Sequence, residues 1–417
     1  MPQVGADSKY QVLPFTSVRD VVSTNPLAIA GIATTAVTRD LPGSLLDTCS
    51  AVAINAVQDA GLAPADIDGL FLTPACMSGE PWLMYAANFA EHLGLTTKGL
   101  MLVENGGATA LLALRSAMDA VALGRCKAAL VVASDTRPML DTNHFESFVR
   151  NVAFTSAALY GGVNAVLGCG APIPIYAMSH QRYMHEFGVT EEEVAMSSVR
   201  LREHAATHPI AQFKELITVE DVLASKPLSL PIHLLQAAGI SSGACAMVVT
   251  TPDMATEVGR PVVEVTGYGE HHHPSHFIPR SGSITRFESV VEAGKAAFSE
   301  SGLSPSDIDV AEVYGVFGAT ELILYEDLGF CPKGEAAHYL ADGNSTYGGD
   351  VVINPSGGRL SMGHPAGATP LYEVAEVVRQ LWGEAPGRQV DDAHVGLVHA
   401  EHGMMNGSVV MTLENRS

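Results

Sequence analysis

Short apolar stretches alternate with helical stretches along most of the chain. Residues 26–35 (PLAIAGIATT) are apolar and β-branched, which predicts a first buried strand. Leu45–Asp59 predicts a helix that Gly61 ends. Residues 127–134 (KAALVVAS) are apolar on both alternating faces, as in a strand of a parallel sheet. The same reading predicts further strands at 67–72, 100–103, 241–250, 262–266 and 407–413, and further helices at 82–93, 109–123 and 287–301.

This alternation breaks down between about residues 135 and 231. Polar, aromatic and histidine-bearing positions are mixed there with short helices, predicted at 175–187 and 191–208. We interpret this region as an inserted loop domain that covers a site, where substrate tails are usually held. Residues 1–25 have no clear period and are predicted to form a leader arm.

Two pairs of matching segments occur in the same order along the chain. Residues 59–70 (DAGLAPADIDGL) match 300–311 (ESGLSPSDIDVA), and Gly107-Ala108-Thr109 matches Gly367-Ala368-Thr369. In the first pair each segment follows a predicted helix and leads into an apolar strand, and in the second pair each segment opens a long helix. The chain is therefore predicted to be an α/β protein with two similar halves, 1–260 and 261–417. Each half should place a glycine turn and a helix start at the carboxyl end of its sheet, where ligands bind.

Composition narrows the class of protein. A chain of 417 residues with 47% hydrophobic and 16% charged positions is typical of a packed globular enzyme with more than one core. The formal charge of −22 argues against nucleic acid as a partner and requires a local basic patch for any phosphate-bearing ligand.

The six cysteines indicate a reducing compartment. They are scattered and form no CxxC motif, so we expect reduced thiols, most of them small buried side chains. The N-terminus has no signal pattern, and no apolar run is long enough to cross a bilayer. We therefore expect a soluble, cytoplasmic protein. The cysteines are Cys49, Cys76, Cys126, Cys169, Cys245 and Cys331.

The strongest candidate for chemistry is the stretch 352–375 (VINPSGGRLSMGHPAGATPLYEVA). Its glycines allow positive φ or close approach of the backbone to a ligand. Among them stands His364, ahead of a proline and near the start of a predicted helix. The unpaired N–H groups and partial positive charge of a helix start suit a developing oxyanion. This pattern indicates acyl or enolate chemistry.

The sequence HHHPSH, with His271, His272, His273 and His276, is not predicted to bind a metal. Adjacent histidines on an extended segment point to opposite faces, and no cysteine or second pair of ligands accompanies them. A solvated loop or the lining of a pocket is the favoured interpretation, and no metal is expected.

Four strings resemble the thiolase superfamily, most closely its sterol-carrier-protein-type and lipid-transfer-protein branch. They are NPSGGRLSMGHPAGAT (354–369), NSTYGGDVVINPSGG (344–358), TELILYEDLGFCPKG (320–334) and GISSGACAMVV (239–249). The resemblance covers nearly the whole chain. It implies a duplicated thiolase fold in five αβαβα layers, a homodimer, and a CoA thioester as substrate without a cofactor. It also implies a small OB-fold, zinc-ribbon acyl-CoA-binding partner.

The chain departs from this family at the catalytic cysteines. The resemblance aligns Gly107 with the nucleophilic cysteine, and the segment 400–408 (AEHGMMNGS) lacks the second one. Tyr314 and Val316 replace the histidine and cysteine of a His-Asp-Cys-Phe motif. A thiolase needs a thiolate to carry the acyl group, and glycine cannot do so. Cysteine-free relatives include aldolases that cleave β-hydroxyacyl-CoA thioesters, but they resemble GGxLSxGY where this chain keeps GHP.

These departures define the predicted site. Tyr314 is the candidate base or proton relay, and His364 is the candidate donor to the thioester oxygen. Glu401 and His402 lie where the second cysteine would be, as proton donors or as loop supports. Asn354 is expected to orient its turn through side-chain-to-backbone bonds. Predicted substrate-binding residues are Gly106, Gly107, Asn354, Gly358, Phe317 and Tyr347, although Tyr347 is favoured as structural; Arg202, Lys214 and Lys226 are candidates for the CoA phosphates.

Three functions remain open. The first is retro-aldol cleavage, or aldol formation, of a β-hydroxyacyl-CoA through a thioester enolate without an acyl-enzyme. The second is a catalytically silent acyl-CoA-binding or scaffold subunit. The third is a Claisen-type acyltransferase with a substitute nucleophile.

Overall fold

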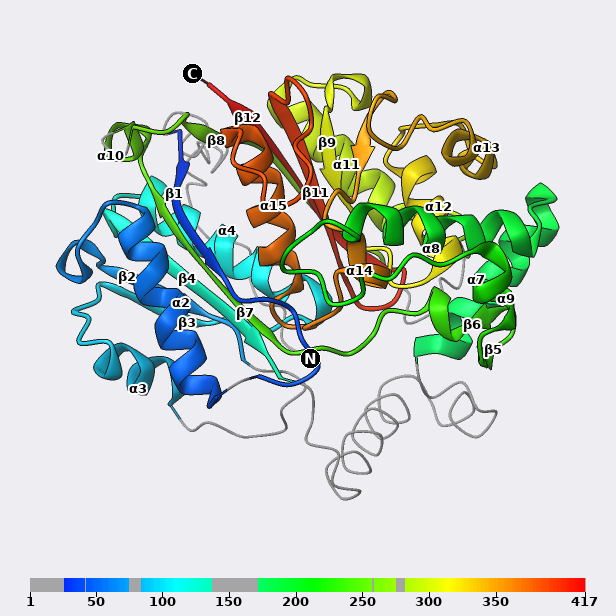
Figure 1. Ribbon diagram of the computed structural model, residues 1–417. Coiled ribbons are helices and arrows are strands. Elements are labelled where there is room, and N and C mark those ends of the chain that lie inside the picture. The colour runs from blue at the N-terminus through cyan, green and yellow to red at the C-terminus, as the bar shows by residue number, and fades with distance from the viewer. Residues whose placement is uncertain are drawn as a thin grey trace, which may run out of the picture.

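The computed structural model describes residues 26–41, 43–74, 84–136, 172–256, 259–274 and 282–416 (Figure 1). The predicted leader arm 1–25 lies outside these ranges, as do Cys76, Cys169, His276 and part of the predicted inserted domain.

The strands form one sheet in the order β10-β9-β11-β12-β8-β1-β7-β4-β2-β3. The first half contributes β1 (Ala28–Thr34), β2 (Gly69–Leu72), β3 (Gly99–Leu102), β4 (Ala128–Asp135) and β7 (Gly243–Thr250). The second half contributes β8 (Val263–His272), β9 (Val310–Glu312), β10 (Val352–Ile353), β11 (Val395–His402) and β12 (Gly407–Asn415). The halves meet where Ala28 and Ile29 of β1 pair with Glu264 and Val263 of β8.

The two halves of the sheet have the same topology. In the first half, β3, β2 and β4 are parallel, β7 is antiparallel to β4, and β1 is antiparallel to β7. In the second half, β10, β9 and β11 are parallel, β12 is antiparallel to β11, and β8 is antiparallel to β12. The predicted duplication is confirmed by this correspondence. The predicted boundary at residues 260 and 261 falls between α10 (Pro252–Thr256) and β8.

The two halves of the sheet and the helices form five layers, and three hydrophobic clusters lie between these layers. The central helices α4 (Thr109–Ala122) and α15 (Thr369–Trp382) share one cluster with strands of both halves. A second cluster joins the outer face of the first half to α2 (Leu45–Asp59) and α3 (Tyr85–His92). The third joins the second half to α11 (Glu288–Ser301), α12 (Gly318–Asp327) and α13 (Ala336–Ala341). Figure 1 shows α4 and α15 lying between the two halves of the sheet.

The described part of the inserted region packs against the second half. It contains α7 (Pro172–Phe187), α8 (Glu191–Ala205), α9 (Val219–Ala224) and the short pair β5 (Pro227–Ser229) and β6 (Ile232–His233). Helices α7 and α8 both contact α12, and α8 also contacts α14 (Gly358–Ser361). The helix predicted to reach residue 208 ends at Ala205, and His208 instead bonds Glu376 through Nε2 at 3.0 Å.

One strand extends beyond the apolar run that predicts it. The apolar run 262–266 predicts the start of this strand, and β8 continues to His272. Two glycines carry it past α11, since a Cβ at Gly267 would lie 2.3 Å from the carbonyl oxygen of Ala297 and one at Gly269 would lie 1.9 Å from that of Ala293. The glycines that interrupt the pattern are therefore places where the strand and helix touch. None of the described helices has both the length and the apolar character that crossing a membrane requires.

Candidate active site

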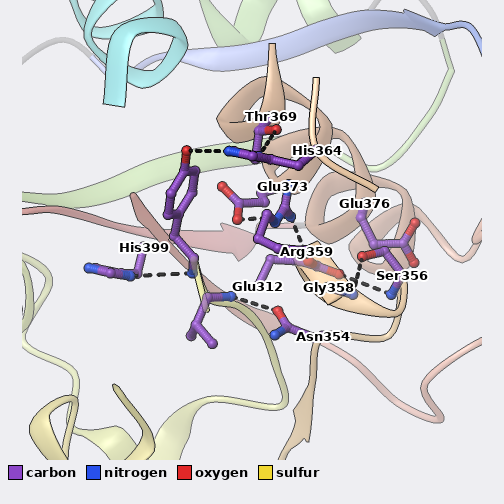
Figure 2. A network of polar contacts seen from close by, with 12 residues as sticks. Glu312, Asn354, Ser356, Gly358, Arg359, His364, Thr369, Glu373, Glu376 and His399 are labelled. Atoms are coloured by element: carbon purple, nitrogen blue, oxygen red, sulfur yellow. Dashed lines mark hydrogen bonds and ion pairs between the residues drawn. The ribbon is translucent and has the colours of Figure 1, made fainter. Parts of the chain in front are cut away.

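Tyr314 and His364 lie in contact. Figure 2 shows His364 beside Thr369 in a network of polar contacts. Tyr314 follows β9 and precedes α12, whereas His364 stands on the glycine-rich segment before α15. The Tyr314 hydroxyl is 3.3 Å from His364 Nε2, and the two rings meet edge to face with centroids 5.4 Å apart. Tyr314 is buried. The two residues that the sequence singles out for acid–base chemistry therefore form one hydrogen-bonded pair.

His364 is held on both sides. Its backbone N–H donates to the carbonyl of Gly239 at 3.1 Å, and its Nδ1 is 3.0 Å from the Thr369 hydroxyl. That hydroxyl also lies 3.1 Å from the carbonyl of Pro365. If Thr369 donates to Pro365, it accepts from Nδ1–H and leaves Nε2 as an acceptor. If Thr369 donates to Nδ1, then Nε2–H is a donor. The site thus supports both tautomers.

His364 is neutral at physiological pH. Burial lowers its pKa to about 3, and the positive charge of Arg359 acts in the same direction. A neutral imidazole can donate a hydrogen bond to an oxygen that becomes negative during a reaction, and it can also accept a proton from a hydroxyl. It brings no permanent charge to the site in either role.

Gly107 stands where the Tyr314 side chain leaves no room for another. A Cβ added at Gly107 would lie 2.6 Å from the Tyr314 hydroxyl oxygen and 2.5 Å from the carbonyl oxygen of Glu401. Both distances are well inside van der Waals contact. A cysteine at this position could not fit without displacing Tyr314. A side chain at position 107 and the observed position of Tyr314 therefore exclude each other.

The turn around Gly107 is fixed by its own polar groups. Gly106 has a φ of +56°, and its N–H donates to Glu104 Oε1 at 3.1 Å. The Thr109 hydroxyl donates to the carbonyl of Gly106 at 2.6 Å and accepts from the N–H of Asn105 at 2.7 Å. Gly106 is exposed, so this turn presents backbone at the site.

Glu401 lies beside this turn at the end of β11. Its Oε1 accepts from the N–H of Met405 at 2.7 Å and from the Tyr176 hydroxyl, while its buried Oε2 has no hydrogen-bond partner among the described residues. Burial raises the pKa of Glu401 to about 7. A carboxyl group that is partly protonated near neutral pH is a suitable proton donor.

His402 contacts two side chains of β8. Its ring stacks on that of His272 with centroids 5.2 Å apart, and its Nε2 is 3.9 Å from Glu270 Oε1. Burial lowers the pKa of His402, and the nearby His272 adds to this effect. His402 thus contacts β8 and also lies against Gly407 of β12, which suits a supporting role, and its predicted role as a proton donor stays a prediction.

Asn354 and Gly358 fix the segments on either side of Tyr314. Asn354 Oδ1 accepts from the N–H of Val313 at 2.7 Å, and its Nδ2 donates to Glu321. A Cβ at Gly358 would lie 2.9 Å from that Nδ2. The sequence predicts that Asn354 bonds the backbone of its own turn, whereas this side-chain-to-backbone bond reaches Val313 on a different segment. Asn354 is fully buried, and its bond to Val313 helps to fix the position of the next residue, Tyr314. Direct substrate contacts of Asn354 and Gly358 stay predictions.

Phe317 and Tyr347 have different neighbours. Phe317 is buried and packs against the ring of Tyr176 with centroids 4.9 Å apart. The Tyr347 hydroxyl donates to the carbonyl of Arg388 at 3.0 Å, and the Arg388 guanidinium lies 4.1 Å from the Tyr347 ring centroid. The contacts of Tyr347 are those of a structural residue, and substrate binding by either residue stays a prediction.

A buried charge cluster below Tyr314 was missed by sequence reasoning. Arg359 is fully buried on α14, with Nη2 2.9 Å from Glu373 Oε1 and 3.5 Å from Glu312 Oε2. Its guanidinium carbon lies 5.8 Å from the centroid of the Tyr314 ring. The available signal was the presence of glutamates inside otherwise apolar stretches, at Glu312 in β9 and Glu373 in α15.

The described cysteines are poor nucleophiles. Cys49, Cys126, Cys245 and Cys331 are all buried and reduced, as expected for packed side chains. Burial raises the pKa of each, to about 12 for Cys245 and Cys331. A thiol must ionise before it can attack a thioester, so these four remain unreactive near neutral pH.

The candidates for binding CoA phosphates differ in their hydrogen-bond partners. Arg202 is buried, and its guanidinium donates to Ser361 at 3.0 Å and to the carbonyl of Glu215 at 3.1 Å. These bonds make Arg202 a structural residue. The Lys214 ammonium donates to the carbonyl of Pro209 at 2.7 Å. Roles for Lys214 and Lys226 in binding CoA stay predictions.

The described histidines of the HHHPSH sequence end β8, and His272 stacks on His402. Within the described ranges, no group of three or more His, Cys, Asp or Glu side chains is placed to hold a metal ion.

The chain is similar to several known proteins along most of its length. A model described as thiolase C-terminal domain-like matches residues 269–415. An acetyl-CoA acetyltransferase of Methanothermobacter thermautotrophicus is 35% identical over 89% of this chain and 95% of its own. A steroid side-chain-cleaving aldolase of Thermomonospora curvata is 31% identical over 86% of this chain and 92% of its own.

Solved structures show the same fold. The Ltp2-ChsH2(DUF35) aldolase superposes with a TM-score of 0.79 at 28% identity, covering 94% of this chain and 98% of that one. Together with the duplicated topology and the matching glycine-rich segment, these similarities establish the family. The chain belongs to the thiolase superfamily, in the branch that includes aldolase-like members.

Proposed function

We propose that this protein is a carbon–carbon lyase that cleaves a β-hydroxyacyl-CoA by a retro-aldol reaction, or forms the same bond in reverse. The Tyr314 hydroxyl passes its own proton to His364 Nε2, and its oxygen takes the proton of the β-hydroxyl group. The bond between Cα and Cβ then breaks, leaving a ketone or aldehyde and an enolate of the shorter acyl-CoA. A proton delivered to Cα completes the reaction without a covalent acyl-enzyme and without a cofactor.

The observation that carries this proposal is the Tyr314 hydroxyl in the space beside Gly107. A thiolase relies on a side-chain sulfur at that position, and here an acid–base group fills it instead. Tyr314 also contacts a neutral imidazole, which suits a proton relay better than the activation of an absent thiol. The 31% identical steroid side-chain-cleaving aldolase supports the same assignment.

We assign the remaining steps to neighbouring groups. The enolate oxygen is stabilised by the backbone N–H at Gly107 and by the His364 N–H, once His364 has taken the proton relayed from Tyr314. Glu401 is the proposed acid that protonates Cα, because burial keeps part of it protonated near pH 7. Its carbonyl oxygen borders the site at Gly107.

Two other functions are alternatives. A Claisen-type acyltransferase agrees with the 35% identical acetyl-CoA acetyltransferase, but it requires a nucleophile, and the described cysteines are buried with raised pKa values. A silent acyl-CoA-binding subunit agrees with the missing cysteine, but it leaves the contact between Tyr314 and His364 without a purpose.

The proposed active form is a homodimer that works with a small OB-fold, zinc-ribbon partner binding acyl-CoA. The similar aldolase structure is named for two components, Ltp2 and ChsH2(DUF35), which supports a partner for this chain. The proposed substrate is a β-hydroxyacyl-CoA; the bulk of its acyl chain is the subject of the experiment.

The test is turnover by the full chain, alone and co-expressed with the candidate partner. β-Hydroxyacyl-CoA thioesters of increasing bulk are supplied, and release of acetyl-CoA or propionyl-CoA is followed together with the ketone or aldehyde. The variant Tyr314→Phe should lower kcat by about 10²- to 10⁴-fold while folding normally, because it removes only the acid–base hydroxyl. The matched control is Tyr268→Phe, which removes a hydroxyl bonded to Glu270 on β8.

Each outcome decides between the functions. Turnover that survives in Tyr314→Phe at the wild-type rate would remove the role given to Tyr314. An acyl-enzyme trapped and detected by mass spectrometry would favour the acyltransferase. Tight binding of acyl-CoA without turnover, with and without the partner, would favour the silent subunit.

A further inference from the structure

Arg359 is a buried positive charge that lies between the Tyr314 ring and the buried carboxyl groups of Glu312 and Glu373. It lies on α14, the short helix directly before His364, and is fully buried. Its guanidinium is held by Glu373 on α15 at 2.9 Å and by Glu312 on β9 at 3.5 Å. On its other side it faces the ring of Tyr314 at 5.8 Å from the centroid.

These contacts connect α15 to both the arginine and the acid–base pair, and Figure 2 shows Arg359, Glu373, Thr369 and His364 in one network. Arg359 pairs with Glu373, which stands one helical turn after Thr369 on α15. Thr369 bonds His364, and His364 bonds Tyr314. The position of the guanidinium relative to the phenol is therefore set by the same helix that sets the imidazole.

We propose that Arg359 is a positioning residue whose guanidinium, fixed against the Tyr314 ring, stabilises the negative charge that appears on the Tyr314 oxygen when its own proton passes to His364 and before that oxygen takes a proton from the substrate. This inference rests on the proposed function, because it assigns Arg359 to the tyrosine that the lyase reaction needs. A charge in a buried, water-poor region acts over several ångströms with little screening. A guanidinium remains positive throughout any accessible pH range.

The neighbouring histidine reports the sign of this field. The positive charge of Arg359 helps to lower the pKa of His364 because it opposes a second positive charge there. The same charge favours a negative one on the adjacent phenol oxygen. Burial raises the pKa of Glu312 to about 7 and that of Glu373 well above its ordinary value, although Arg359 opposes both shifts. Burial thus opposes ionisation of both carboxyl groups, which limits how far they cancel the charge of the arginine.

Other titratable groups face this unit from each packed element. Around Tyr314 these are His364 before α15, His399 and Glu401 on β11, and Tyr176 on α7. Around Arg359 these are Glu312 on β9, Glu373 on α15 and Glu321 on α12. The test therefore has to read Tyr314 itself, because a pH profile of activity would combine all of these groups.

The experiment places 3-fluorotyrosine at position 314 of the full chain and follows the ¹⁹F chemical shift with pH. In Arg359→Met, the tyrosinate signal should appear at a pH higher by about one unit or more, because a buried charge a few ångströms away is lost. Arg359→Lys keeps the charge and should shift the midpoint by less than about half as much. In the unlabelled chain, Arg359→Met should lower kcat about tenfold with little change in KM.

The controls address folding and location. Because Arg359→Met strands Glu373, the double variant Arg359→Met/Glu373→Gln is titrated as well, and it should show the same upward shift. Arg202→Met removes a buried arginine that bonds Ser361 on α14 and lies over Phe213, and it should leave the midpoint unchanged.

An unchanged midpoint in both folded Arg359→Met chains would overturn the inference. The wild-type chain could also show no lyase turnover while Arg359→Met still raises the midpoint. That result would support the charge coupling and overturn only the proposed function, since the fluorine signal does not depend on catalysis.

Discussion

The two halves of the molecule bring the same helix start to the site but use it differently. In the first half, residues 104–109 read ENGGAT, and in the second, residues 364–369 read HPAGAT. Thr109 and Thr369 each begin the central helix of their half. The Thr109 hydroxyl closes on its own turn through Gly106 and Asn105, whereas the Thr369 hydroxyl reaches the imidazole of His364.

The comparison shows where the chemistry has moved. The first-half turn has no side chain at Gly107, and the Tyr314 hydroxyl from the second half occupies that space. The second-half turn supplies His364, and the position that corresponds to His364 is the exposed Glu104. The first half therefore contributes backbone and room, while the second half contributes the groups that exchange protons.

The largest effect should come from removing the His364 side chain, compared with removing that of Glu104 at the corresponding position of the first half. His364→Ala removes the proposed donor and half of the acid–base pair, so kcat should fall by about 10²- to 10³-fold. Glu104→Ala removes only an exposed acceptor for the N–H of Gly106, and kcat should change far less. Steady-state kinetics on the substrate identified for the wild type measures both. Equal losses in the two variants would contradict the division of roles between the halves.

A smaller effect should come from the paired glycines. A methyl group at Gly107 would overlap the Tyr314 hydroxyl and the Glu401 carbonyl, so Gly107→Ala should reduce the free energy of unfolding by about 1–3 kcal/mol and also lower kcat. At Gly367 the nearest atom is the Pro74 carbonyl oxygen at 3.1 Å, and Gly367→Ala should cost less. Urea denaturation of both variants gives the comparison. A Gly107→Ala chain as stable and active as the wild type would show that Tyr314 does not need this space.

Much of the fold could be predicted because it depends on local burial. The helix Leu45–Asp59 and the apolar strand β4 follow directly from the spacing of apolar positions, and the repeat predicts the duplicated topology. The length of β8 could not be predicted, because Gly267 and Gly269 weaken the strand pattern while allowing contact with α11. A packing requirement between distant segments has no local signature.

The site was predictable in its members but not in its geometry. The segment around His364 is recognisable, and the resemblance directs attention to Tyr314 and Gly107. That the tyrosine hydroxyl fills the space beside the glycine depends on how β9 meets the first-half turn, which no sequence spacing encodes. Arg359 was missed because an arginine beside two glycines looks like a solvated turn residue, whereas the fold encloses it between two glutamates.

The smallest effect concerns the pH dependence of stability, which should arise mainly in the second half. Burial raises the pKa of Glu312 and Glu401 to about 7 and that of Glu321 to about 8, all on second-half elements. Burial lowers the pKa of His364 and His399 to about 3, so both are neutral in the folded chain. In the unfolded chain each is still about half protonated at about pH 6.5, which offsets part of the effect of the three carboxyl groups but less than all of it.

Between pH 6.5 and 8 the folded chain therefore binds more protons than the unfolded chain, in which these carboxyl groups are already ionised. The free energy of unfolding must then fall as the pH rises, by about 1–3 kcal/mol over this range. Glu321→Gln keeps an oxygen that can accept from Asn354 and Tyr325 but cannot titrate, so it should remove about half of this decrease. Urea denaturation at both pH values tests the sign. Stability that rises with pH in this window would mean that these carboxyl groups are ionised in the folded protein, leaving the charge of Arg359 cancelled before it can act on Tyr314.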